Sequence, residues 1–346
     1  MQTRTVGIDL GKTVFHLVAQ DERGKVVGRK RCSRTQLLAY TAKLPSCVIG
    51  MEACPGAHFL GARLTEQGHQ VRLIPAQFVR PFVKSNKNDY LDAEAIAEAV
   101  QRPTMRFVPI KTVDQLDLQA VHRMRDQLVA RRTGIINQIR AFLLERGIAV
   151  RQGRKHLYHH MASLLEDAEQ SLSTRMRTLL SRQWREWQEL DTHIQELSAE
   201  IENAAQQDET CRRLLGIPGV GTLTATALIA AIGNGSAFRK GRDFSAWLGL
   251  VPRQNTTGGR TRLLGISKHG NSYLRRLFIH GARAIAIHMS RQHHHLGQWM
   301  NQLEARVHRN VFVVAIANKL ARIAWAVLAK GEAYRPFAQL QSIAVS

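Results

Sequence analysis

Four carboxylates in the first hundred residues have the types and spacing of a metal site. Asp9 lies near the end of the first predicted strand and Glu52 follows a later one, so neighbouring strands would bring both to one sheet edge. Asp89 and Asp92 are three residues apart at the start of a predicted helix, hence on one face. Mg²⁺ prefers carboxylate ligands, and a metal pair can assist phosphodiester cleavage. Singly, each carboxylate could instead be a helix first-turn charge or a surface residue.

A pair of hydroxyl groups lies in a basic, glycine-rich stretch over residues 250–271. Thr256 and Thr257 precede two glycines. Six cations surround them in the sequence: Arg253, Arg260, Arg262, Lys268, Arg275 and Arg276. Arginine binds phosphate and stabilises charge that develops at phosphorus, and a hydroxyl becomes a nucleophile when a base or metal activates it. The alternative is a flexible loop that only positions a nucleic acid.

Strands and helices that could position the carboxylates alternate over residues 1–110. Strands are predicted over residues 5–10, 14–19, 25–31, 47–51 and 70–74. Helices are predicted over residues 35–44, 56–67 and 89–100. This order predicts a mixed sheet flanked by helices, which is an α/β domain.

The segment over residues 111–208 is predicted to be helical. Apolar residues recur there at steps of three and four: Leu180, Trp184, Trp187, Leu190, Ile194, Leu197 and Ile201. An earlier stripe could pair with them: Leu128, Ile135, Ile139 and Phe142. Packing within one subunit and a seam between two subunits are both open, so the segment is a spacer or a dimerisation arm.

Residues 209–346 predict a basic, mainly helical domain. The turn over residues 216–221 fits a helix-hairpin-helix, in which Gly219 and Gly221 let the backbone approach a phosphate. A plain turn between helices is the alternative. Of the 49 Lys and Arg and 27 Asp and Glu in the 346-residue chain, residues 211–346 hold 19 basic and three acidic ones. With a net charge of +22, the expected partner is a nucleic acid.

Other classes of protein fit these features less well. Residues 7–12 resemble the first phosphate loop of actin-like ATPases, but no second such loop or adenosine pocket follows. Four separated cysteines make a zinc ribbon or a disulfide framework unlikely to be the scaffold, and His288 and His293–His295 are expected to be exposed rather than metal-bound. Without a signal segment, an apolar run of about 20 residues or an amphipathic anchor, we expect a soluble cytoplasmic protein and no membrane.

The order and spacing of the motifs resemble the DEDD transposases of the Piv/MooV invertase type, insertion-sequence recombinases guided by a bridge RNA. The matching segments are residues 7–9, 51–56, 88–93, 217–221, 248–252 and 266–275. The resemblance implies three domains: a ribonuclease-H-like fold similar to Holliday-junction resolvases (1–110), a coiled-coil insertion (111–208), and a transposase domain bearing a nucleophilic serine (209–346).

The resemblance also implies roles for particular residues. A Mg²⁺-binding tetrad would be formed by Asp9, Glu52, Asp89 and Asp92. Where the family has its serine, this chain has Thr256 and Thr257, and the β-methyl group of a threonine crowds attack. Ser267 matches the Ser-Lys segment of the family rather than its nucleophile. Threonine catalysis, a neighbouring serine and a weakened enzyme therefore remain open.

These features predict a Mg²⁺-dependent, site-specific recombinase that mobilises its own insertion sequence through a covalent link to DNA. The resemblance implies a bridge RNA that selects donor and target DNA. Because the tetrad and the threonines lie in different domains, we expect a composite site in a homo-oligomer, a dimer or a tetramer, near the prokaryotic nucleoid. The alternative is a structure-specific junction nuclease or junction-binding protein without strand transfer.

Overall fold

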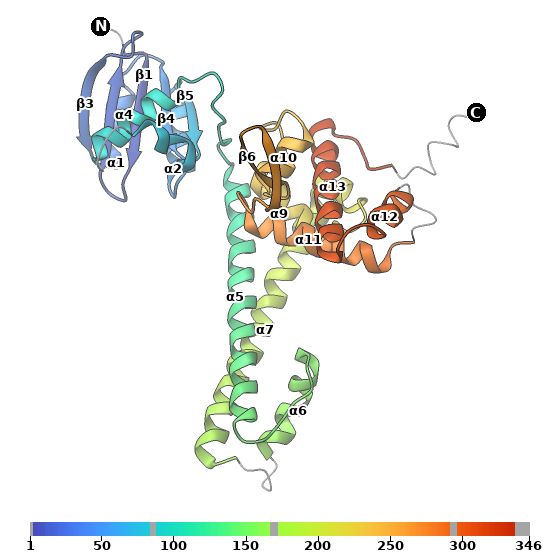
Figure 1. Ribbon diagram of the computed structural model, residues 1–346. Helices are drawn as coiled ribbons and strands as arrows, with labels where there is room; N and C mark the ends of the chain where they lie inside the picture. The colour runs from blue at the N-terminus through green and yellow to red at the C-terminus, as the bar shows by residue number, and fades with distance from the viewer. Residues whose placement is uncertain (1–2, 84–87, 167–171, 291–295, 336–346) are drawn as a thin grey trace. The chain divides into compact units, whose positions relative to one another are not determined.

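The computed structural model describes residues 3–83, 88–166, 172–290 and 296–335 (Figure 1). Its contacts divide the chain into two units, Met1–Thr112 and Val113–Ser346. Each unit has a hydrophobic core of its own.

The first unit contains a mixed five-stranded sheet, as predicted. Its strands, in the order β3-β2-β1-β4-β5, are β3 (Val26–Cys32), β2 (Phe15–Gln20), β1 (Thr5–Leu10), β4 (Val48–Glu52) and β5 (Gln70–Ile74). The pairs β1–β2 and β2–β3 are antiparallel, whereas β1–β4 and β4–β5 are parallel. The prediction that the strands of Asp9 and Glu52 are neighbours is therefore confirmed.

Helices cover both faces of this sheet. On one face, α1 (Arg34–Thr41) and α2 (Ala57–Glu66) bury leucines against the side chains of β1 and β4. On the other face lies α4 (Asp89–Ala99), preceded by the short helices α3 (Ala76–Val79) and η1 (Arg80–Phe82), which were not predicted. The predicted helices are all present, with shifts of at most three residues at their ends.

Two glycines allow α4 to approach the sheet closely. A Cβ atom on Gly7 of β1 would lie 2.0 Å from the carbonyl oxygen of Ala93, and one on Gly50 of β4 would lie 2.9 Å from Cβ of Val100. Because side chains alternate along a strand, Gly7 and Gly50 share this face with the residues two positions later. The helix backbone thus packs directly on the strands that carry Asp9 and Glu52.

The second unit begins with a helical arm. Its long helices α5 (Val113–Leu144) and α7 (Thr174–Gln207) run antiparallel, and α6 (Arg154–Glu166) packs beside them (Figure 1). The apolar stripe predicted on residues 180–201 packs against α5 within the same chain, with Leu180 and Trp187 fully buried. Of the two alternatives left open by the sequence, packing within one subunit is the one observed.

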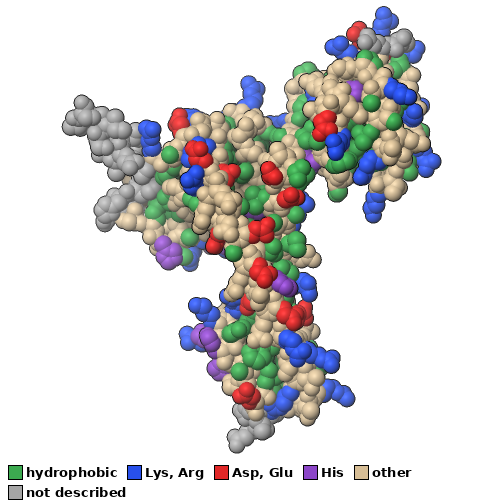
Figure 2. Space-filling model, turned by 180° about the vertical axis from the view of Figure 1, so that it is seen from behind, with side chains coloured by type: hydrophobic (Ala, Val, Ile, Leu, Met, Phe, Trp, Pro, Cys, Tyr) green, Lys and Arg blue, Asp and Glu red, His purple; other side chains and the backbone are tan. Residues whose placement is uncertain are grey.

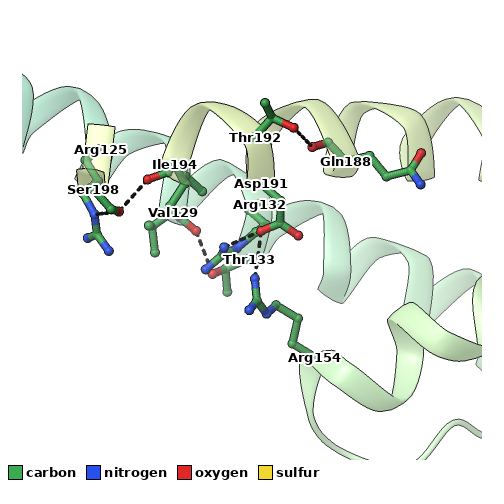
Figure 3. A network of polar contacts seen from close by, with 10 residues as sticks. All are labelled: Arg125, Val129, Arg132, Thr133, Arg154, Gln188, Asp191, Thr192, Ile194 and Ser198. Atoms are coloured by element: carbon green, nitrogen blue, oxygen red, sulfur yellow. Dashed lines mark hydrogen bonds and ion pairs between the residues drawn. The ribbon is translucent and has the colours of Figure 1, made fainter. Parts of the chain in front are cut away.

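A carboxylate joins the three helices of the arm. Asp191 of α7 accepts hydrogen bonds from Arg132 of α5 at 2.6 Å and from Arg154 of α6 at 2.8 Å (Figure 3). Farther along the arm, Nε of Arg125 donates to Oγ of Ser198 at 2.8 Å, which again links α5 to α7. The Asp191 and Arg132 side chains are largely shielded from solvent, so their ion pair is stronger than one on an open surface.

Six further helices complete the second unit around one core. They are α8 (Glu209–Leu215), α9 (Thr222–Ile232), α10 (Gly241–Trp247), α11 (Ser272–His288), α12 (Gly297–Glu304) and α13 (Arg309–Lys330). By length and composition α13 could cross a membrane, with a mean hydropathy of 1.8. Half of that stretch is buried, and its residues Phe312, Ile316 and Leu320 lie in the core, as expected for the central helix of a folded domain.

The basic, glycine-rich stretch at residues 250–271, which was predicted only to interrupt the helices, contains a β-hairpin. Strands β6 (Pro252–Thr257) and β7 (Arg260–Ile266) pair antiparallel. Gly258 and Gly259 form the two-residue turn with φ of +56° and +75°, the combination that a type I′ hairpin turn requires. The hairpin was missed because its strands bury no apolar face, so they lack the alternating pattern of a half-buried strand.

A buried histidine ties the arm to the helices around it. Nε2 of His122 (α5) lies 2.9 Å from Oγ1 of Thr226 (α9), and its Nδ1 lies 3.0 Å from the hydroxyl of Tyr273 (α11). The Thr226 hydroxyl donates to the carbonyl of Thr222, so Nε2 must be the donor and Nδ1 the acceptor of a neutral imidazole. Burial, followed by the charge of Arg125, lowers the pKa of His122 to about 4.

Gly7→Ala should destabilise the first unit by about 3 kcal/mol, because the new methyl group overlaps the backbone of α4. Gly28→Ala in β3 is the matched control, since its Cβ would meet only the methyl group of Ala19 at 3.8 Å; it should cost less than about 1 kcal/mol. Scanning calorimetry measures both. Equal losses would show that the close approach of α4 is not the constraint.

The second unit should lose stability as the pH falls from about 6.5 towards 4. In that window the imidazole of His122 binds a proton in the unfolded chain but not in the folded protein. This group alone therefore lowers the free energy of unfolding by about 1.4 kcal/mol for each pH unit. Urea unfolding followed by tryptophan fluorescence reports this unit, which holds all five tryptophans. In His122→Gln this component of the pH dependence should disappear; an unchanged slope would contradict the assignment.

Candidate active site

The four predicted carboxylates line one open cleft of about 990 Å³ in the first unit. Asp9 comes from β1, Glu52 from the end of β4, and Asp89 and Asp92 from the first turn of α4. Residues from three elements that are distant in the sequence thus meet at one edge of the sheet.

The local sequence explains why these side chains converge. Asp9 follows Gly7 by two positions and Glu52 follows Gly50 by two, so both carboxylates point to the face on which α4 packs. Asn88 begins that helix, and its side chain accepts a hydrogen bond from the amide of Tyr90 at 3.0 Å. This cap fixes the first turn of α4 and therefore the positions of Asp89 and Asp92.

The electrostatics of the cleft are those of crowded negative charge. Burial raises the pKa of Asp9, and the charges of Asp92 and Asp89 raise it further. Burial also raises the pKa of Glu52, with a second contribution from Asp92. Repulsion of this kind is relieved by a proton or by a bound cation.

The donor set of the cleft suits a divalent cation. Its oxygen ligands are those of Mg²⁺ or Mn²⁺, and Asp92 is the carboxylate whose charge raises the pKa of both Asp9 and Glu52. Within the described parts of the chain, no three His, Cys, Asp or Glu side chains form a ready-made coordination cluster. Filling the site therefore requires these side chains to draw together around the ion.

Among the lining residues that were not predicted from the sequence, three are ionisable: Lys12, His16 and Arg80. His16 lies opposite Asp9 in the β1–β2 pairing, and its Nδ1 is 3.5 Å from Oδ2 of Asp89. Its ring also meets Tyr90 edge-on at 4.9 Å. Strand alternation could have placed His16 on this face, whereas the positions of Lys12 and Arg80 depend on tertiary packing.

The hairpin presents its two threonines on opposite faces. Thr257 lies across from Arg260, and Asn255 from Arg262, so these residues share one face. On the other face Oγ1 of Thr256 lies 3.2 Å from that of Thr261 and accepts a hydrogen bond from Gln254 at 3.1 Å. Both hydroxyls and the guanidinium groups of the hairpin are exposed, so a nucleic acid can reach them.

The other predicted residues near the hairpin have structural contacts. The hydroxyl oxygen of Ser267 is buried and has no hydrogen-bond partner, so it cannot meet a phosphate in this arrangement. Arg275 donates to the carbonyls of Leu248 and His269 at 2.9 and 2.7 Å, and burial lowers its pKa. Arg276 pairs with Asp126 of α5, whereas Lys268 is exposed, with a φ of +56°.

The glycines of the turn between α8 and α9 differ in their surroundings. Gly219 has a φ of +77°, and its Cβ would lie 2.8 Å from the carbonyl oxygen of Gly281, so it packs against α11. Gly221 is exposed and precedes the first turn of α9 without a side-chain cap. Of the histidines considered above, His288 ends α11 and is exposed, whereas residues 293–295 lie outside the described residues.

Comparison with known proteins identifies the class. The DEDD model of the IS110 group, described as "Transposase", matches residues 6–147, and the model described as "Transposase IS116/IS110/IS902 family" matches residues 211–298. The transposase for insertion sequence element IS1328 of Yersinia enterocolitica is 46% identical over 95% of this chain and 98% of its own length. The transposase for insertion sequence element IS1111A of Coxiella burnetii is 42% identical over 96% and 91% of the two chains.

A more distant similarity connects the chain to an invertase. The pilin gene-inverting protein of Moraxella bovis is 26% identical over 107 residues, 30% of this chain and 33% of that protein. Together the matches define an insertion-sequence DNA transposase. The chain belongs to the IS110/IS1111 family of DEDD transposases, which confirms the resemblance seen in its motifs.

This family fits both units of the structure. The mixed sheet of the first unit is the ribonuclease-H-like DEDD domain, and the C-terminal domain is mainly helical. The DEDD domain implies a divalent metal, in agreement with the carboxylate oxygens that line the cleft. The carboxylates and the threonines belong to different units of the chain.

Divalent cations should stabilise the first unit. At a Mn²⁺ or Mg²⁺ concentration of 100 times Kd, the gain is about 2.7 kcal/mol. Asp9→Asn should abolish the gain because it removes a carboxylate from the cleft, whereas Glu22→Gln, in the exposed β2–β3 turn, should leave it intact. Titration calorimetry and thermal unfolding test this; metal binding that survives in Asp9→Asn would place the ion elsewhere.

Proposed function

We propose that this transposase is an RNA-guided recombinase that cuts and exchanges DNA strands through a covalent threonine–DNA intermediate. The observation that supports this best is the convergence of Asp9, Glu52, Asp89 and Asp92 on one cleft that is open to a DNA strand. The exposed hydroxyls of the β6–β7 hairpin supply the second half of the chemistry.

In the first unit, the tetrad would hold a divalent ion that assists cleavage of the DNA backbone. Bound Mg²⁺ would supply polarisation of the phosphate oxygens and stabilisation of the developing charge. Lys12 and Arg80 line the same cleft, where their charges offset the repulsion between the carboxylates and the DNA backbone. His16 restrains Asp89 in the orientation that faces the cleft.

In the second unit, the hydroxyl of Thr256 or Thr257 attacks phosphorus. The Oγ–P bond forms as the threonine gives up its proton, and the bond from phosphorus to a deoxyribose oxygen breaks, releasing a DNA hydroxyl. A hydroxyl of the partner strand then attacks the phosphothreonine, restores the threonine and joins the new strand. Arg253, Arg260 and Arg262 neutralise the charge of the phosphate.

Nucleic-acid contacts extend beyond the hairpin. Phosphate would be bound by the backbone of Gly219 and Gly221 and by the ammonium group of Lys268. The base of the hairpin is supported by Arg275 and Arg276. The domain over residues 1–110 would cut, the helical segment 111–208 would connect, and residues 209–346 would carry the nucleophile. Because the halves of the site lie in different units, a dimer or tetramer assembles the complete site.

The RNA part of the proposal rests on family membership and on charge. A bridge RNA would select donor and target by base pairing, while the protein holds both partners through phosphate contacts that carry no sequence information. The work would take place in the bacterial cytoplasm, beside the nucleoid. A structure-specific junction nuclease is the second candidate, because the acidic cleft alone would suffice for hydrolysis.

Trapping the covalent intermediate identifies the nucleophile. A labelled DNA substrate should become attached to the wild-type protein, and mass spectrometry should find the phosphopeptide within residues 252–266. Alanine at the attacking threonine should reduce adduct formation by at least about 100-fold, serine at that position should restore it, and Ser267→Ala should retain it. DNA cleavage without any adduct would favour the junction nuclease.

Purification from the native host tests RNA guidance. The protein should carry one abundant RNA encoded beside its gene, with segments that match donor and target DNA. An RNA mixture that high salt removes would instead show that the charge of +22 binds polyanions without selection.

A further inference from the structure

A cationic and aromatic surface lies outside the carboxylate cleft, on the opposite face of the N-terminal sheet. Phe59 of α2 is 47% exposed. The guanidinium carbons of Arg34 and Arg63 lie 5.6 and 5.8 Å from the centre of its ring. We call Arg34, Phe59 and Arg63 the stacking surface.

The core of the domain does not explain the position of Phe59. The buried face of α2 is formed by Leu60 and Leu64, which pack beneath the sheet, whereas the phenyl ring points to solvent. Arg34 is held in place from below, since its guanidinium also lies 5.9 Å from the ring of the buried Phe15. Among the described residues no carboxylate pairs with Arg34, so its charge is available to a ligand.

The stacking surface begins at the same sheet edge as the cleft. Phe15 and His16 are consecutive on β2 and point to opposite faces, the first to the core under Arg34 and the second into the cleft. Helix α1 begins two residues after β3 ends, and α2 begins five residues after β4 ends at Glu52. A DNA strand that leaves the cleft would reach Phe59 by crossing this edge of the sheet.

Positive charge continues along that route. Lys12 and Arg80 line the cleft, and the exposed Arg31 lies opposite His16 in the β2–β3 pairing. On the visible face of the N-terminal unit, Lys and Arg side chains border hydrophobic ones (Figure 2). Arginine and an aromatic ring are the groups on which unpaired bases stack, with phosphates held by the guanidinium.

We propose that the stacking surface binds the unpaired DNA strand beside the cleft, with a base stacked on Phe59 and a phosphate on Arg34, while Arg63, which is paired with Glu66 at 2.9 Å, supports the ring of Phe59. The inference rests on the proposed function, because strand exchange requires unpaired DNA near the carboxylates. Binding is independent of sequence, since every base has a π face, and it excludes duplex DNA, whose bases are stacked on one another.

Fluorescence anisotropy with the full-length protein tests this assignment. The probe is a labelled 12-nucleotide DNA strand, compared with the duplex of the same sequence. Phe59→Ala should weaken single-strand binding about tenfold, and Phe59→Trp should keep it within about twofold, because only a flat ring supports stacking. Arg34→Ala should weaken single-strand binding and lower the salt dependence of that binding. Arg23 is an exposed arginine in the β2–β3 turn, and Arg23→Ala should change the single-strand affinity less than about twofold.

Each contrary outcome has a distinct meaning. Unchanged single-strand affinity in Phe59→Ala, or an equal loss for duplex DNA, would overturn the stacking surface. If Phe59→Ala weakened the binding of an RNA 12-mer but not of the DNA strand, the assignment of the stacking surface to DNA would be overturned. Failure of the proposed function is seen separately, as the absence of a threonine–DNA adduct in the wild-type protein, and circular dichroism of each variant excludes misfolding as the cause.

Discussion

The close approach of α4 to the sheet is the constraint on which the catalytic cleft depends. A single methyl group at Gly7 would overlap the α4 backbone, so the missing side chains of β1 and β4 are what bring the helix down to the strands. The same pleat that turns these glycines towards α4 turns Asp9 and Glu52 towards Asp92. Electrostatic repulsion among them opposes this arrangement, and the buried apolar core on both faces of the sheet offsets it.

The β6–β7 hairpin depends on a different kind of constraint. None of its side chains lies in a core, so its shape comes from backbone hydrogen bonds and from the two glycines of its turn. An isolated two-stranded ribbon is marginally stable in water, and here Arg275 and the turn around Gly270 fix its base. A ribbon that exposes three arginines and three threonines on a fixed base is well suited to close over a nucleic acid backbone without disturbing the helical core.

The sequence predicted what depends on local pattern. The strands and helices of the first unit have clear periodicity, and the strands that carry Asp9 and Glu52 are neighbours, as expected. The hairpin was not predicted, because its fully exposed strands lack the alternation of apolar and polar residues that marks a half-buried strand. Lys12 and Arg80 were missed as cleft residues for a related reason: single surface cations carry no pattern, and only tertiary packing brings them beside Asp9.

The charges of the cleft also affect how it can bind a DNA phosphate. Four carboxylates repel a DNA phosphate, and among the described residues Lys12 and Arg80 bring two positive charges to the same cleft. A divalent ion held by these carboxylates would offset this repulsion and favour a phosphate in the cleft. Without the ion, the positive charge of residues 211–346 still holds nucleic acid. The two units thus contribute differently: the first carries the carboxylate cleft, and residues 211–346 of the second carry most of the excess positive charge.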